Sequence, residues 1–172
     1  KWEKNMTICN EPTIRKFSGK PFTEISWDLD FKRFGIDKYS DDMLYLMYRR
    51  VYDLAGITDK SVNVYLNDKK IIIKSFMDYV NLYPIEYNKY QETISDRWDV
   101  IVSLSNNDTF EHVSFVNGIF TSKGGSHVDN ISKQLISGIH EFVKKTHKKD
   151  IPEKVIKRYI SIYINSVIEN PS

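Results

Sequence analysis

The chain has 172 residues, of which 41% are hydrophobic and 13% aromatic, enough to bury the core of one domain or of two small subdomains. Charged residues make up 28%, but the formal net charge is only +2, which excludes a protein that holds nucleic acid by its overall charge and leaves only local basic sites. The single cysteine, Cys9, excludes an internal disulfide, and no apolar run approaches the roughly 20 residues that span a bilayer, so we expect an intracellular protein without a membrane segment.

Two short segments near the start of the chain predict a β-hairpin. Residues 13–17 and 22–27 each contain apolar side chains, and they flank residues 18–21. The connecting residues contain glycine and proline, which are typical of a turn. We therefore expect residues 13–27 to form two antiparallel strands.

A helix is predicted to follow from Ser40. This serine suits an N-cap, and Asp41 and Asp42 in the first turn complement the helix dipole. Gly56 is expected to end the helix. Apolar residues recur at three- and four-residue spacing, at Leu44, Met47, Val51 and Leu54. We expect this apolar face to pack on a core rather than to bind a ligand.

A second hairpin is predicted at residues 62–66 and 70–74. Its strands are joined by residues 67–69, where Asn and Asp tolerate the left-handed backbone of a tight turn. A short helix is then expected, capped by Ser75 and ended by Pro84.

The second half of the chain begins with residues 84–96, which lack a clear period and are expected to form a surface connection. A subdomain boundary is therefore placed near Pro84. Residues 98–104 alternate in polarity as a strand does, and residues 106–108 suit a turn. Residues 110–117 are expected to be the antiparallel partner of that strand.

A long helix and a last strand complete the predicted order of elements. The helix is expected to be capped by Asp129 or Ser126, and residues 160–165 alternate as a strand with one buried face. The helix is indicated by an apolar stripe of about 3.6-residue period, formed by Ile131, Leu135, Ile136, Ile139, Phe142 and Val143. The second half is therefore predicted to contain two strands, a helix and a last strand, in that order.

A glycine turn precedes this helix. Gly124 and Gly125 allow positive φ angles, and Lys123 lies beside them, so the helix N-terminus would attract an anion. The spacing matches neither a Walker A loop nor G-x-G-x-x-G. Two interpretations stay open: an anion-binding turn, or glycines that only turn the chain tightly between strand and helix.

The largest local charge follows the predicted helix. Residues 144–158 contain seven cationic and two acidic side chains, an excess of +5. The four cations that lie just past the apolar stripe are Lys144, Lys145, Lys148 and Lys149. They predict a salt-sensitive, sequence-independent contact with DNA phosphates. A solvated helix end, whose cations complement the helix dipole, explains the same composition.

No catalytic or metal centre is predicted. The histidines show neither H-E-x-x-H spacing nor a cysteine partner, which argues against zinc at His112, His127, His140 or His147. Acidic residues are scattered along the chain, and the presence of Ser, His and Asp does not define a triad. The residues alone therefore suggest no active site.

Several segments match one known family in order. The longest is residues 114–129, SFVNGIFTSKGGSHVD. The others are Trp2 with Asn5 and Met6, residues 22–27, residues 49–56, residues 74–80, Arg97 with Trp98, and residues 168–171. Together they closely resemble the ATPase region of eukaryotic-type type IIA DNA topoisomerases, and ordered matches through nearly the whole chain are highly specific.

The resemblance implies an α+β fold. Residues 1–83 would be the C-terminal part of a GHKL ATPase domain with its sheet, and residues 84–172 most of a transducer domain with a left-handed βαβ crossover, as in small-subunit ribosomal proteins. In this family the transducer relays nucleotide state to the DNA-cleaving core, and a lysine-rich loop after its long helix senses DNA. Lys144 and Lys145 match that loop, while Thr146 stands where a third lysine can occur.

The resemblance also implies a function. Enzymes of this family pass one DNA duplex through a transient double-strand break in another, use ATP and Mg, and work as homodimers, with the nucleus as the expected location and a viral or cytoplasmic parent left open. The Mg-binding acidic helix and glycine-rich lid would precede Lys1. The Q-T-K loop and the catalytic tyrosine would follow Ser172. We therefore expect this chain alone to bind no ATP, hydrolyse none and cut no DNA.

Two alternatives to this interpretation stay open. A stand-alone α+β module without enzymatic activity would bind nucleic acid through residues 144–158 and stack bases on exposed tyrosines. The second alternative is a structural interaction domain. The absence of an initiator methionine at Lys1 favours the topoisomerase interpretation, in which the chain is a piece of a longer protein.

Overall fold

The computed structural model describes residues 1–170. Pro171, which ends the family-like segment 168–171, and Ser172, which ends the predicted transducer domain, lie outside the described residues. The chain divides into two compact units, Lys1–Tyr45 and Leu46–Ser172. The predicted domain boundary near Pro84 stays a prediction. No helix among residues 1–170 has the length and apolar character needed to cross a membrane.

The first unit holds little regular structure. Strand β1 (Trp2–Glu3) pairs antiparallel with β2 (Ile8–Cys9). Residues 13–17 and 22–27 form no strand, so the predicted hairpin is wrong. Their apolar side chains stay largely in solvent: Ile14 is 92% and Ile25 84% exposed. A two-stranded ribbon without a covering layer is only marginally stable, which explains the difference.

Helix α1 (Asp41–Ile57) confirms the prediction at its start. The Met43 backbone N–H donates to Ser40 Oγ at 3.3 Å, so the serine caps the helix as expected. The carboxylates of Asp41 and Asp42 lie in the first turn, where they complement the positive end of the helix dipole.

Helix α2 (Phe76–Val80) packs closely against the end of α1. Ser75 caps it as predicted, since the Asp78 backbone N–H donates to Ser75 Oγ at 3.1 Å. Gly56 does not end α1 but is buried in its last turn. A Cβ at Gly56 would lie only 2.5 Å from Cβ of Tyr79 in α2, so the glycine permits close contact between the two helices.

The hairpin predicted between these helices is confirmed, with shorter strands. Strand β3 (Tyr65–Leu66) pairs antiparallel with β4 (Lys69–Lys70). Asn67 and Asp68 have φ angles of 48° and 62°, the left-handed backbone that the sequence predicts for this turn.

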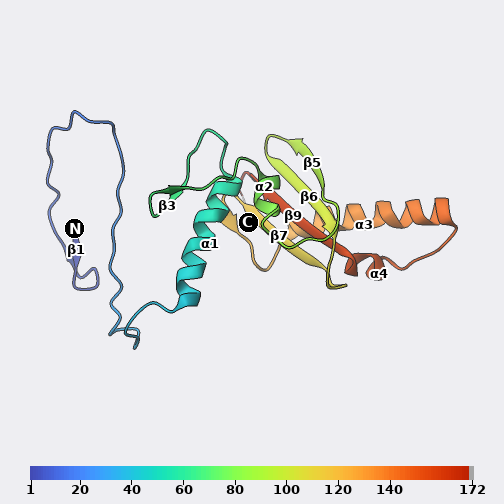
Figure 1. Cartoon of the computed structure of the whole chain (residues 1–172), viewed down its shortest axis with the longest axis horizontal. Helices are drawn as coiled ribbons and strands as arrows, with labels where there is room; N and C mark the ends of the chain where they lie inside the picture. Colours follow the sequence, from blue (N-terminus) through green and yellow to red (C-terminus); the bar gives the residue numbers. More distant parts are fainter. Residues whose placement is uncertain (171–172) are drawn as a thin grey trace. The chain divides into compact units, whose positions relative to one another are not determined.

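A five-stranded mixed sheet forms the centre of the second unit, in the order β5, β6, β9, β7, β8 (Figure 1). Strand β9 pairs antiparallel with β6 and parallel with β7. The strands are β5 (Tyr90–Ser95), β6 (Trp98–Leu104), β7 (Glu111–Val116), β8 (Ile119–Phe120) and β9 (Ile160–Ser166). Helices α3 (Ser126–His147) and α4 (Glu153–Arg158) form the crossover between β8 and β9. The α+β class with a mixed sheet confirms the expected fold class.

Two predictions about strand positions are corrected by this sheet. Strand β9 lies between β6 and β7, so β7 is not the antiparallel partner of β6. Six of the seven residues of β9 are buried, so both of its faces are covered rather than one. Small Ser161 and aromatic Tyr163 fill the face that looks polar in the sequence.

The predicted surface connection is also partly wrong, because it contains the edge strand β5. All six residues of β5 are exposed. An edge strand that meets solvent on its outer side needs little apolar patterning, which explains why residues 84–96 show no clear period.

The sheet carries helices on both faces. On one face, Val100 of β6 packs in a cluster with Val128 and Ile136 of α3 and Ile156 of α4. On the other face, Ile101 of β6 packs with residues of α2, and the cluster includes Phe76, Tyr79, Val80, Phe115 and Tyr163. Helices α1 and α2 therefore lie on the opposite face of the sheet from α3 and α4.

Candidate nucleic-acid interface

The four predicted DNA-contacting lysines lie at the end of α3. Lys144 and Lys145 occupy its last turn, Lys148 is its C-cap with a left-handed φ of 55°, and Lys149 begins the loop to α4. All four side chains are exposed. Helix α3 extends past the strands of the sheet, so its end is open to solvent (Figure 1). The geometry leaves these four lysine side chains open to solvent.

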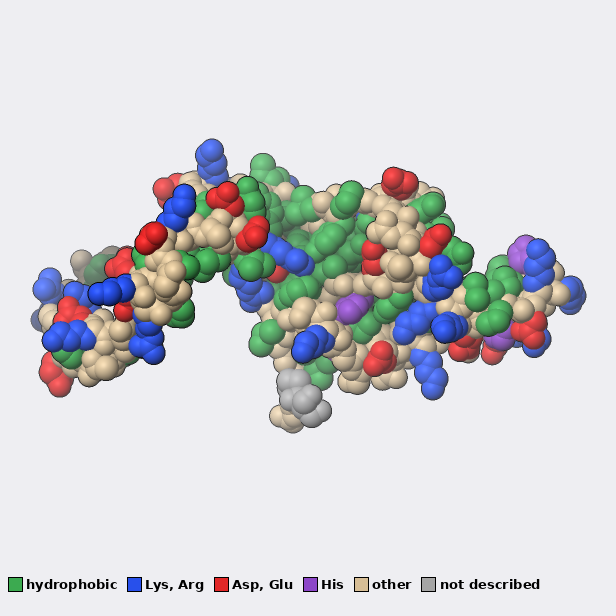
Figure 2. Space-filling model, turned by 90° about the horizontal axis from the view of Figure 1, so that it is seen from below, with side chains coloured by type: hydrophobic (Ala, Val, Ile, Leu, Met, Phe, Trp, Pro, Cys, Tyr) green, Lys and Arg blue, Asp and Glu red, His purple; other side chains and the backbone are tan. Residues whose placement is uncertain are grey.

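Further cations lie on α4, a helix that the sequence analysis did not predict. Its six residues are too few for an apolar period, and only Pro152 followed by Glu153 signals a helix start. The Lys157 ammonium lies 4.6 Å from the centre of the Phe110 ring, and Arg158 Nε donates to the Asp108 carbonyl at 3.2 Å. Figure 2 shows Lys and Arg side chains mixed with acidic ones on this part of the surface.

Acidic side chains pair with two of the four lysines. Lys144 Nζ lies 3.3 Å from Asp150 Oδ2, and Lys145 Nζ lies 3.4 Å from Glu141 Oε2. Among residues 1–170, Lys148 and Lys149 form no ion pair. Exposed ion pairs contribute at most about 1 kcal/mol, so a phosphate can replace them.

Asp150 is a site residue that the sequence analysis missed. Its Oδ1 lies 2.8 Å from His140 Nε2, so one carboxylate holds both His140 and Lys144. The hydrogen bond with His140, and after it the one from Lys144, lowers the pKa of Asp150 below its usual value. The carboxylate is therefore charged at neutral pH and forms an ion pair with Lys144. Its signal in the sequence is a lone acid just beyond a lysine run.

The glycine turn with Lys123 has a steric explanation in the structure. The Gly124 backbone N–H donates to the Thr121 carbonyl at 3.0 Å and closes the turn. With φ of +73°, a Cβ at Gly124 would lie 3.1 Å from His112 Nε2. Gly125, with φ of 151°, occupies the N-cap of α3 without a side-chain cap. The expected caps, Asp129 and Ser126, are therefore wrong, because α3 already begins at Ser126.

Two histidines line the inner side of this turn. His127 Nε2 lies 3.1 Å from Thr121 Oγ1, and burial lowers the pKa of His127, so the neutral ring is favoured. His112 Nε2 is buried and has no hydrogen-bond partner among residues 1–170. Within the same residues, no three His, Cys, Asp or Glu side chains are grouped so as to hold a metal ion.

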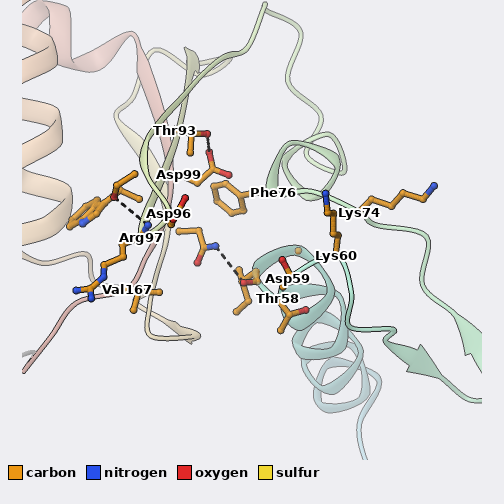
Figure 3. A pocket seen from close by; sticks show the side chains of 15 residues that line it. Thr58, Asp59, Lys60, Lys74, Phe76, Thr93, Asp96, Arg97, Asp99 and Val167 are labelled. Atoms are coloured by element: carbon orange, nitrogen blue, oxygen red, sulfur yellow. Dashed lines mark hydrogen bonds between the residues drawn. The ribbon is translucent and has the colours of Figure 1, made fainter.

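A cavity of about 580 Å³ lies on the other side of the second unit, between the end of α1 and the turn from β5 to β6 (Figure 3). Three cations and three carboxylates line it: Lys60, Lys74, Arg97, Asp59, Asp96 and Asp99. These charges balance, so the cavity has no excess that would attract a phosphate backbone. None of the predicted site residues lines it.

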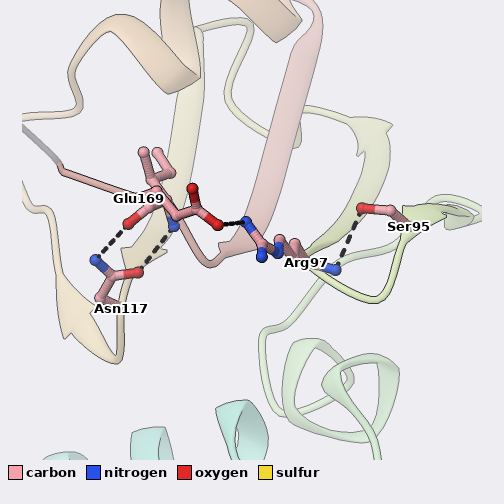
Figure 4. A network of polar contacts seen from close by, with 5 residues as sticks. Ser95, Arg97, Asn117 and Glu169 are labelled. Carbon is pink, nitrogen blue, oxygen red and sulfur yellow. Dashed lines mark hydrogen bonds and ion pairs between the residues drawn. The ribbon is translucent and has the colours of Figure 1, made fainter.

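Arg97 also belongs to a polar network that brings three family-like segments together (Figure 4). Its Nη1 lies 2.5 Å from Glu169 Oε1. The adjacent Ile168 backbone exchanges two hydrogen bonds with the Asn117 side chain, at 2.8 and 2.9 Å. The chain beyond β9 is thereby fixed to the β5–β6 and β7–β8 turns.

Comparison with known proteins identifies the family of this chain. Residues 58–172 match the family described as DNA gyrase B. The chain is 37% identical to DNA topoisomerase 2 of Saccharomyces cerevisiae, over 100% of this chain and 13% of that protein. It is 39% identical to DNA topoisomerase 2 top-2 of Caenorhabditis elegans, over 99% of this chain and 12% of that protein. The chain thus spans only about an eighth of the length of these relatives.

A solved structure shows the same fold. The crystal structure of the ATPase region of Saccharomyces cerevisiae topoisomerase II matches 99% of this chain and 44% of that one, with a TM-score of 0.85 and 37% identity. The agreement covers both units of the chain.

Proposed function

Because the chain belongs to the DNA gyrase B family, with eukaryotic DNA topoisomerases 2 as its relatives, we propose that it works as part of an ATP-dependent type II DNA topoisomerase. The longer enzyme passes one DNA duplex through a transient double-strand break in another. This region couples ATP binding and hydrolysis to movement of the DNA gate. The observation that carries the proposal is the match to a topoisomerase II ATPase region over 99% of the chain.

The proposed coupling has a physical basis in the sheet. Helices cover both of its faces, and the buried central strand β9 hydrogen-bonds to both β6 and β7. Such a layered body resists bending because packed interiors have low compressibility. Movement imposed on α1 and α2 at one face would therefore reach α3 at the other.

DNA is the proposed partner at the lysine end of α3. Lys148 and Lys149 are the stronger contacts, because they have no acidic partner among residues 1–170, while Lys144 and Lys145 must exchange theirs. The turn of Lys123, Gly124 and Gly125 is a weaker anion site, since its glycines already have a steric role.

ATP and Mg are the proposed cofactors of the whole enzyme, with a homodimer as its state and the nucleus as its location. We expect the 172-residue chain to hydrolyse no ATP by itself. The alternative of a stand-alone nucleic-acid-binding module receives no support, since the relatives match the whole chain.

The salt dependence of DNA binding tests this assignment. Replacing Lys148 and Lys149 by alanine in the full-length enzyme should weaken binding to random-sequence duplex DNA. It should also reduce the slope of log K against log salt by up to about 2. The matched control replaces Lys69 and Lys70, which stand side by side on strand β4. If both double variants bind alike, the lysine end does not contact DNA.

A further inference from the structure

The family-like segment of residues 49–56 lies on α1, and the function proposed above leaves its side chains unexplained. At its centre Asp53 is only 3% exposed. Its Oδ1 accepts a hydrogen bond from the Tyr79 hydroxyl of α2 at 2.7 Å, and that hydroxyl lies 2.9 Å from the Tyr83 hydroxyl. A carboxylate is thus held inside the protein between two helices.

Arg49, one turn earlier on α1, makes two contacts with this group and one with the sheet. Its Nε lies 3.9 Å from Asp53 Oδ1, and its Nη2 donates to the Tyr83 hydroxyl at 3.4 Å. The guanidinium also lies 4.7 Å from the centre of the Phe120 ring in β8. We call Arg49, Asp53, Tyr79 and Tyr83 the α1 joint.

Neighbouring residues of α1 extend the connection to the sheet. Arg50 Nη2 donates to the Gly118 carbonyl, in the turn between β7 and β8, at 2.8 Å. At the end of α1 the Ile57 carbonyl accepts from Asn165 of β9 at 3.5 Å. Helix α1 is therefore bonded to α2, to the β7–β8 turn and to the central strand.

The contribution of the α1 joint to folding stability does not explain why polar side chains are buried here. Burying a carboxylate is costly unless it is hydrogen-bonded, and well-packed apolar side chains of similar volume are often at least as stable. Hydrogen bonds depend on direction, however, while apolar packing does not. The α1 joint therefore specifies one orientation of α1 on the sheet.

We propose that the α1 joint makes α1 and the sheet turn as one body, with Arg49 as the positioning residue that connects the joint to Phe120 of strand β8. This inference rests on the proposed function, because it names the contacts through which nucleotide state would be transmitted. It assigns no group that touches nucleotide or DNA.

The test measures ATP hydrolysis by the full-length enzyme with and without saturating DNA. Tyr79→Phe removes the hydroxyl that holds Asp53, and Arg49→Met removes the guanidinium but keeps an apolar stem. Each variant should keep its basal rate and lose at least about fivefold in stimulation by DNA, the lower end of ordinary coupling energies. The control is Tyr163→Phe, because this buried tyrosine packs on Tyr83 but its hydroxyl forms no hydrogen bond with the α1 joint among residues 1–170; it should keep normal stimulation.

The outcomes separate the two proposals. If the unchanged enzyme shows no stimulation by DNA, the proposed function fails. If stimulation is normal in the unchanged enzyme and in both variants, the α1 joint does not transmit. An equal loss of basal and stimulated rates would also overturn the inference, since it indicates a structural role only. Arg49 has a side chain that is 44% exposed, so Arg49→Met gives an answer even if Tyr79→Phe unfolds.

Discussion

Two aspartates, one buried in helix α1 and one in the exposed loop after α3, show what burial does to the same chemical group. Asp53 is almost fully buried and holds α1 against α2 through one short hydrogen bond. Asp150 has a side chain that is 68% exposed and pairs with His140 and Lys144. The buried carboxylate has no water to replace its partner, so it fixes geometry. The exposed carboxylate can exchange its partners with solvent, so it fixes no orientation.

The largest effect is expected where the two helices of the buried region meet. Gly56→Ala should cost about 1–3 kcal/mol of unfolding free energy, because the added Cβ would overlap Tyr79. Gly138→Ala in α3 is the control, since nothing lies within 4 Å of its Cβ position. It should stabilise by about 0.5–1 kcal/mol. Urea unfolding of the chain measures both, and equal effects would disprove the close contact.

The next effect concerns the hydrogen bond to Asp53. Tyr79→Phe should destabilise the chain by about 1–3 kcal/mol, because it leaves a buried carboxylate without its donor. Tyr90→Phe makes the same chemical change on the exposed edge strand β5 and should stay within about 0.5 kcal/mol. A Tyr79 variant as stable as the Tyr90 variant would show that the buried hydrogen bond contributes nothing.

His127 at the start of α3 and His147 at its end allow the same comparison of buried and exposed groups through the pH dependence of stability. Burial lowers the pKa of His127 in the folded chain below its usual value of about 6.5, so the unfolded chain binds more protons below that pH. Stability should therefore fall as the pH drops through about 6.5. The measurement is the melting temperature as a function of pH. His127→Gln should reduce the fall in melting temperature at low pH, whereas His147→Gln, at the exposed end of α3, should leave that fall unchanged. A fall that is the same in both variants would contradict the assignment.

The smallest change in stability is expected for a substitution of the exposed Asp150. The same substitution should increase the affinity for DNA. Asp150→Asn releases Lys144 and should raise the affinity of the full-length enzyme for DNA by up to about fivefold at low salt. The melting temperature should hardly change. Asp68→Asn removes the same charge from the β3–β4 turn as a control. Lower affinity in Asp150→Asn would show that Asp150 orders the lysines rather than competing for them.

The sequence predicts elements well where one local signal is enough. Ser40 with a regular apolar stripe identifies α1, and Asn67 with Asp68 identifies the β3–β4 turn. The pairing of strands that lie far apart in the chain is harder to predict from the sequence. Nothing within residues 110–117 indicates that β9 would insert beside them, since that order depends on helices packing over both faces.

The same limit applies to the candidate site. The lysines are visible in the sequence as a charge excess, and the structure confirms their exposure. The α1 joint is not visible, because Asp53 and Tyr79 are 26 residues apart and become partners only when α1 and α2 pack. Gly56 resembles a helix terminator in the sequence for the same reason: the neighbour that requires it lies in another helix.

The most direct test of the central claim compares the two regions in one titration. ATP hydrolysis by the full-length enzyme is measured against increasing DNA for the Lys148→Ala, Lys149→Ala double variant and for Arg49→Met. We expect the lysine variant to need more DNA but to reach normal stimulation of ATP hydrolysis. It loses contacts with DNA but keeps the contacts of α1 that transmit the signal. We expect Arg49→Met to reach a lower plateau at any DNA concentration. A normal plateau in Arg49→Met would contradict the claim that the buried contacts of α1 transmit the signal.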